Sequence, residues 1–104
     1  MIIAVDFDGT LACRKGGKLV PNIGLINWLI NMQMSGNAVI LNTCRTGESL
    51  REAVVFCSKY GLGLNAVNEN LPQSISMLGY NPRKIYADVY IDDKALKPFM
   101  PSGE

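Results

Sequence analysis

The chain has 104 residues, 48% of them hydrophobic, and a formal net charge of +1. This length predicts a single domain, residues 1–104, and the near-neutral charge argues neither for nor against an extended nucleic-acid surface. The sequence contains no histidine. That absence excludes Ser-His-Asp and Cys-His catalysis and the usual zinc sites, so acid–base chemistry would fall to carboxylates, lysine, tyrosine or cysteine.

The three cysteines, Cys13, Cys44 and Cys57, follow no metal-binding spacing. Free thiols in a reducing compartment account for them. The apolar run at the start stops at Asp6, and no stretch approaches the roughly 18 apolar residues that a membrane span requires. We therefore expect a soluble, cytoplasmic protein that does not contact a membrane.

Three segments are predicted in the first third of the chain. Residues 2–6 form an apolar run ending in an acid, which is typical of a strand buried on both faces. Residues 11–21, with a Gly-Gly pair between basic residues, predict a short hairpin or flap. Residues 22–35 have a helical pattern, with Asn22 as N-cap and Gly36 as the stop. The apolar side of this helix is broad, which indicates either cover on more than one side or a surface for a second copy.

Strands and helices alternate along the rest of the chain, which predicts parallel βαβ units with right-handed crossovers. The fold class is therefore α/β, with a short parallel sheet. Counting the sheet strands in chain order, we expect the spatial order 4-1-2-3. The remaining elements are a buried strand at 38–42, a helix from Thr46 or Gly47 to Gly61, a weaker strand at 64–67, a short helix from Pro72 to Gly79, a strand at 85–91 and a frayed tail at 95–104.

Polar side chains follow three of the predicted strands. Asp6 ends the first, Thr43 follows the second, and Asp92 and Asp93 follow the last. Ligand sites in parallel sheets lie outside the carboxyl ends of the strands, and the expected order makes the first and last strands neighbours. Carboxylates gathered there repel one another unless a cation joins them, and oxygen ligands alone favour Mg²⁺.

These residue types permit phosphate chemistry. Mg²⁺ allows a carboxylate to attack a phosphate dianion, and carboxylates are established nucleophiles in forming aspartyl-phosphate. Gly9 permits a sharp turn, after which backbone N–H groups can face an anion. Thr43 offers a hydroxyl to a phosphate oxygen, and Lys84 offers a positive charge.

The motifs resemble those of the haloacid dehalogenase superfamily of phosphatases. Asp-Phe-Asp-Gly-Thr at 6–10 is similar to motif I, Ile-Leu-Asn-Thr at 40–43 to motif II, Lys84 to the basic motif III, and Tyr-Ile-Asp-Asp at 90–93 to the acidic motif IV. They keep the family's order and span residues 2–93. The resemblance implies a three-layer Rossmann-like fold, here with no cap domain. It also implies a Mg²⁺-dependent phosphomonoester hydrolase that works through an aspartyl-phosphate intermediate.

The resemblance also implies roles. Asp6 attacks phosphorus and binds Mg²⁺, while Asp8 is the general acid/base and offers its backbone carbonyl to the metal. Thr43 and Lys84 hold the transferring phosphoryl group. The other expected contacts are a metal ligand at Asp92 or Asp93 and substrate contacts at Gly9, Thr10 and Arg45, although Arg45 could equally be only a loop residue.

The chain departs from the family by having no insertion long enough for a cap domain. An open site suits bulky substrates such as nucleic-acid ends or phosphoproteins, or a partner that acts as a lid. Ile-Asp-Asp-Lys, and Thr-x-Arg after the second strand, resemble nucleotidases and polynucleotide phosphatases and so favour a nucleotide or a nucleic-acid end. Arg14, Lys15 and Lys18 are either a solvated hairpin or a nucleic-acid contact.

Two other functions use similar residues. A receiver-type signalling domain carries its acceptor aspartate in mid-chain, whereas the strand at 64–67 offers none. The second alternative is a non-catalytic phosphate- or Mg²⁺-binding subunit of a larger assembly. The presence of both Asp6 and Asp8 argues against it.

Overall fold

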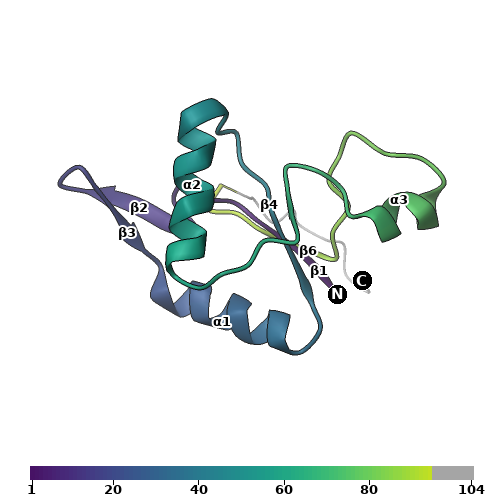
Figure 1. Cartoon of the computed structure of the whole chain (residues 1–104), viewed down its shortest axis with the longest axis horizontal. Helices are drawn as coiled ribbons and strands as arrows, with labels where there is room; N and C mark the ends of the chain where they lie inside the picture. Colours follow the sequence, from purple (N-terminus) through teal and green to yellow (C-terminus); the bar gives the residue numbers. More distant parts are fainter. Residues whose placement is uncertain (95–104) are drawn as a thin grey trace, which may run out of the picture.

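The computed structural model describes residues 1–94, so the tail predicted at 95–104 lies outside the described residues (Figure 1). Within that range the chain is a small α/β, Rossmann-like domain with no cap or other additional domain. Its elements are β1 (Ile2–Val5), β2 (Ala12–Lys15), β3 (Lys18–Pro21), α1 (Ile23–Met34), β4 (Ala38–Leu41), α2 (Gly47–Lys59), β5 (Ala66–Val67), α3 (Pro72–Leu78) and β6 (Val89–Ile91).

Four parallel strands form the main sheet, in the order β5-β4-β1-β6. Read from the β6 edge, this is the predicted order 4-1-2-3, which is therefore confirmed. β1 lies in the interior of the sheet, with Ile3 opposite Val39 of β4 on one side and Val89 of β6 on the other. The first and last strands are thus neighbours, and the residues that follow them leave the sheet at the same edge.

The last strand is shorter than predicted, because β6 begins at Val89 and residues 85–88 are not part of it. The side chain of Asn70 holds the preceding loop instead, since its Oδ1 accepts a hydrogen bond from the Tyr86 N–H at 2.6 Å. The first backbone hydrogen bond from this segment to β1 runs from the Asp88 N–H to the Ile2 carbonyl at 2.8 Å. An apolar run alone does not reveal that a distant side chain replaces a strand partner.

Helices α1 and α2 cover one face of the sheet, and α3 lies on the other side near the start of β1 (Figure 1). Because side chains alternate along a strand, every second residue of β1 and β4 points to the first face. Those residues share one buried core with the two helices: Ile3, Val5, Val39, Leu41, Ile26, Leu29, Ala53 and Phe56. The three predicted layers are present, and the third is short.

The hairpin predicted at 11–21 is confirmed as the antiparallel pair β2 and β3, which extends away from the sheet in Figure 1. Gly16 and Gly17 make its turn with φ values of 58° and 79°. A two-residue turn with both φ values positive matches the twist of the strands and favours glycine. The sequence signal for the hairpin was therefore the glycine pair itself.

The boundaries of α1 follow its predicted caps. The Asn22 side chain accepts a hydrogen bond from the Leu25 N–H at 3.2 Å, and Gly36 follows the helix with a φ of 94°. Ile23 and Met34 are exposed, so part of the broad apolar side faces solvent. None of the described helices has the length and hydropathy needed to cross a lipid bilayer.

At the other edge of the sheet, β5 is only two residues long, and the asparagines on either side of it bond β4 and the segment that follows β4. The Val39 N–H donates to Asn65 Oδ1 and the Thr43 N–H to Asn68 Oδ1, each at 2.8 Å. Asn68 has a φ of 54°, a conformation that asparagine tolerates better than most residues. The second bond fixes the backbone of Thr43 where β4 ends.

Candidate functional site

The candidate site is a hollow of about 310 Å³ at the carboxyl edge of the sheet. Its walls come from the segments that follow β1, β4 and β6, as expected from the positions of polar residues after these strands. The lining residues are Asp6, Asp8, Asn42, Thr43, Cys44, Asp92 and Lys94. The structure therefore brings four of the nine predicted site residues to the lining of one hollow, namely Asp6, Asp8, Thr43 and Asp92.

Three carboxylates converge at this edge. One oxygen from each of Asp6, Asp92 and Asp93 lies within 4.8 Å of the other two. Burial raises the pKa of Asp6 above its usual range, and the charges of Asp92, Asp93 and Asp8 raise it further, against a lowering hydrogen bond from a backbone N–H. The sequence left open which of Asp92 and Asp93 joins Asp6, and the structure places both there. Such a group of oxygen donors could hold a hard divalent cation.

Gly9 makes room for this cluster. Its φ is +77°, and a Cβ added there would lie 2.2 Å from Asp93 Oδ2 and 2.9 Å from Asp93 Cγ. Any other residue would be strained in its backbone and would force the Asp93 side chain to move. The glycine therefore serves the turn and the acidic cluster together.

The backbone N–H groups of Gly9 and Thr10 are already bonded within the turn. The Gly9 N–H donates to the Ala12 carbonyl at 2.8 Å and the Thr10 N–H to the Phe7 carbonyl at 3.2 Å. Both residues line a separate hollow beneath the hairpin. Neither Gly9 nor Thr10 therefore has a free backbone N–H for the substrate contact that the sequence predicted.

Thr43 lies at the hollow with its backbone held by Asn68. Its Oγ1 accepts a hydrogen bond from the Arg45 N–H at 3.2 Å. A hydroxyl that accepts one bond still has its own O–H to donate. Thr43 can therefore offer a proton to an oxygen of a bound anion.

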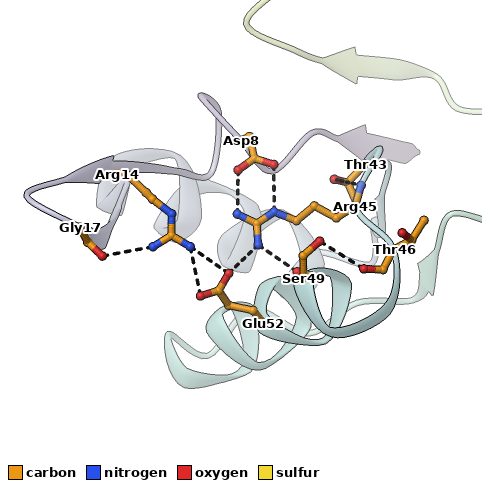
Figure 2. Close-up of polar contacts among 8 residues, drawn as sticks. All are labelled: Asp8, Arg14, Gly17, Thr43, Arg45, Thr46, Ser49 and Glu52. Carbon is orange, nitrogen blue, oxygen red and sulfur yellow. Dashed lines mark hydrogen bonds and ion pairs between the residues drawn. The ribbon is translucent and has the colours of Figure 1, made fainter.

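Asp8 has very different surroundings from Asp6, because it forms a two-pronged ion pair with Arg45 (Figure 2). Arg45 Nε donates to Asp8 Oδ2 at 2.9 Å and Nη2 donates to Oδ1 at 2.8 Å. Arg45 Nη1 donates to the Ser49 carbonyl at 2.9 Å and to Glu52 Oε1 at 2.7 Å. The hydrogen bonds and charge of Arg45 hold the pKa of Asp8 below its usual range.

The ion pairs continue from α2 to the hairpin. Glu52 also accepts hydrogen bonds from Arg14 of β2, at 3.1 and 3.2 Å, and Arg14 donates to the Gly17 carbonyl at the hairpin turn (Figure 2). Arg14 and Glu52 are each about half exposed, with side-chain exposures of 51% and 45%. Solvent screens such a pair, so it orients the hairpin weakly.

The lysine at the acidic hollow is not the one that the sequence predicted. Lys84 does not line the acidic hollow, since its Nζ lies 5.1 Å from the centroid of the Tyr90 ring, in a second hollow of about 460 Å³. Lys94 lines the acidic hollow instead, and its N–H donates to Asp92 Oδ1 at 3.0 Å. Sequence reasoning missed Lys94, although its place directly after Asp92 and Asp93 was a usable signal.

Fold and site together define a class: small α/β proteins of Rossmann-like fold with an acidic cluster at the carboxyl edge of a parallel sheet. No protein-family model matches the chain, and no functionally curated protein does. A solved structure does match, and it is described as that of a conserved protein coded by a locus from Bacteroides thetaiotaomicron. Identity is 35% over 92% of this chain and 78% of the other, with a TM-score of 0.75. The chain belongs to the same family as that conserved protein.

Proposed function

We propose that this protein is a Mg²⁺-dependent phosphomonoester hydrolase of the haloacid dehalogenase type, with Asp6 as its nucleophile. One observation carries the proposal: the carboxylates of Asp6, Asp92 and Asp93 meet within 4.8 Å beside a hollow that Asp8 and Thr43 also line. Carboxylates this close repel one another, and a hard divalent cation offsets that repulsion.

The donor set suits Mg²⁺. Asp6, Asp92 and Asp93 would hold the ion through oxygens alone, and Asp92 and Asp93 are exposed enough to leave space for water and a substrate oxygen. When bound, Mg²⁺ would offset the negative charge shared by a substrate phosphate and the Asp6 carboxylate.

The remaining steps fall to side chains of this chain. An Asp6 oxygen attacks phosphorus and the bond to the leaving oxygen breaks, while the protonated form of Asp8, which the pair with Arg45 disfavours, gives that oxygen a proton. The Thr43 hydroxyl donates to an oxygen of the transferring group, and Lys94 supplies the positive charge that the family resemblance assigned to Lys84. Asp8 then takes a proton from water, whose oxygen attacks the aspartyl-phosphate and releases phosphate and a free Asp6 carboxylate.

The open site favours substrates whose leaving group extends beyond the hollow, such as a nucleotide or a phosphorylated nucleic-acid end. The hairpin is the one flap-like element within residues 1–94. A partner protein would be a second source of a lid.

The test is a phosphatase screen with Mg²⁺ over sugar phosphates, nucleotides and phosphorylated DNA or RNA ends. We expect hydrolysis that stops in EDTA and falls at least about 1000-fold in Asp6→Asn, because removal of a covalent nucleophile leaves only binding and polarisation. Glu69→Gln is the matched control, because Glu69 is an exposed acid outside the hollow.

Activity that survives Asp6→Asn, or that is equal in EDTA, would contradict the mechanism. A protein that binds Mg²⁺ but hydrolyses nothing in the screen would instead be the non-catalytic binding subunit.

A further inference from the structure

Arg45 has almost no hydrogen-bonding capacity left for a ligand. A guanidinium group carries five N–H donors, and four of them are used on Asp8, Ser49 and Glu52 (Figure 2). Arginine usually binds phosphate through two parallel N–H groups. The single donor that remains cannot form such a pair, so the arrangement disfavours Arg45 as a phosphate ligand.

The guanidinium group is also fixed in place. Its Cζ lies 4.7 Å from the centroid of the fully buried Phe7 ring, and the Arg45 side chain is only 11% exposed. The Asp8 side chain, in contrast, is 61% exposed. An exposed aspartate on a turn would otherwise sample several rotamers, so in this pair Arg45 is the rigid partner and Asp8 is the side chain that it orders.

We propose that Arg45 is a positioning residue, which holds the Asp8 carboxylate at the rim of the acidic hollow and does not bind the substrate phosphate. Ser49 and Glu52 of α2 anchor Arg45 from the opposite side. The inference rests on the proposed function, because it concerns the part that Asp8 takes in that reaction.

This role has a kinetic signature. Both oxygens of Asp8 accept hydrogen bonds from Arg45, so the pair favours the ionised carboxylate. That form takes a proton from water in the second step, whatever group has left. Loss of Arg45 therefore slows the second step for every substrate, whereas in the first step the loss of position is opposed by easier protonation of Asp8.

The experiment compares Arg45→Lys and Arg45→Gln with wild type on glycerol phosphate and 4-nitrophenyl phosphate. We expect kcat on the aryl ester to fall about 100-fold, while kcat/KM, which reports the steps up to release of the leaving group, changes less than about 5-fold on either ester. Because the second step becomes limiting, the aryl ester should show a burst of about one nitrophenolate per enzyme. Asp8→Asn should show the same burst and should also lower kcat/KM on the alkyl ester, because it removes the acid of the first step, and the double variant should be no worse than Asp8→Asn.

Arg51→Gln is the matched control, an exposed arginine of α2 outside the hollow and outside the ion pairs described above, and its kinetics should equal wild type. Equal losses of kcat/KM on both esters, together with a raised KM and no burst, would overturn the proposal, since they would mean that Arg45 holds the phosphate.

A second measurement does not depend on activity or on folding of the Arg45 variants. In ¹⁵N NMR of the intact protein, the Arg45 Nε–H should give a slowly exchanging signal that broadens or disappears in Asp8→Ala. An unchanged signal would overturn the pairing itself. A protein with this coupled signal but no phosphatase activity would remove the proposed function and leave the pairing in place, so the two failures are distinguishable.

Discussion

Asp6 and Asp8 are two positions apart in the chain, and their surroundings are opposite in charge. Asp6 is partly buried beside Asp92 and Asp93, and these surroundings raise its pKa. Asp8 lines the same hollow, but there the hydrogen bonds and charge of Arg45 lower its pKa. The turn thus divides the site into an acidic half, which is electrostatically incomplete, and a paired half, which is neutralised by the protein itself.

This difference shows what each half requires. Two like charges held close together need a charge from outside the chain, whereas a bidentate arginine–carboxylate pair needs none. A cation should therefore act on the acidic half and leave the paired half nearly unchanged. The predictions below use that contrast.

The largest expected effect is stabilisation by Mg²⁺. At a concentration about 100 times its Kd, the ion should raise the free energy of unfolding by about 2.7 kcal/mol. Asp92→Asn should lose most of this gain, while Asp8→Asn, whose side chain is paired with Arg45, should keep it. Thermal unfolding with Mg²⁺ and in EDTA measures both, and equal losses in the two variants would contradict the division of the site.

A smaller effect is expected from Gly9→Ala, compared with Gly17→Ala at a nearly equal φ of +79°. In EDTA both variants should lose about 1–2 kcal/mol, because alanine is strained in the left-handed conformation. With Mg²⁺, Gly17→Ala should keep the full stabilisation, since a Cβ there contacts nothing within 4 Å. Gly9→Ala should keep little of it, because the new Cβ displaces Asp93. Urea unfolding of both variants with and without the ion separates the strain from the loss of the cluster.

The smallest effect is the pH dependence of stability in EDTA. The raised pKa of Asp6 means that the folded state binds its proton more readily than the unfolded chain, so this residue destabilises the fold as pH rises above about 4. The lowered pKa of Asp8 has the opposite sign, giving stability above about pH 4 that is lost as pH falls through the folded-state pKa.

At neutral pH, Asp6→Asn should therefore be more stable than wild type and Asp8→Asn less stable, with both differences shrinking toward about pH 3. Urea unfolding of wild type and the two variants at several pH values between neutral and about pH 3 measures these differences in stability. The same sign for both variants would show that the two aspartates do not differ as described.

Much of the fold was predictable because its signals are local. The buried strand before Asp6, the glycine pair of the hairpin and the Asn22 cap of α1 each lie within a few residues of the structure that they determine. The strand order followed from the parallel crossovers, and it placed Asp6 beside the residues after β6.

The details of the site were less predictable because they depend on long-range contacts. Arg45 and Asp8 are 37 positions apart, and only the folded chain shows that one orders the other. The loop before β6 follows the Asn70 side chain, which makes the strand shorter than its apolar run suggests. Lys84 belongs to that loop and lines a different hollow, and Lys94 lines the acidic hollow instead.

The very short strand β5 has a consequence for how the protein behaves at high concentration. A long, flat edge strand offers unpaired backbone groups to other chains and promotes aggregation. Here the N–H groups of Val39 in β4 and of Thr43 after β4 are bonded to the side chains of Asn65 and Asn68 rather than to a continuous strand. An incoming strand therefore meets a border of only two residues at this edge, which is too short a template for a neighbouring molecule to extend the sheet there.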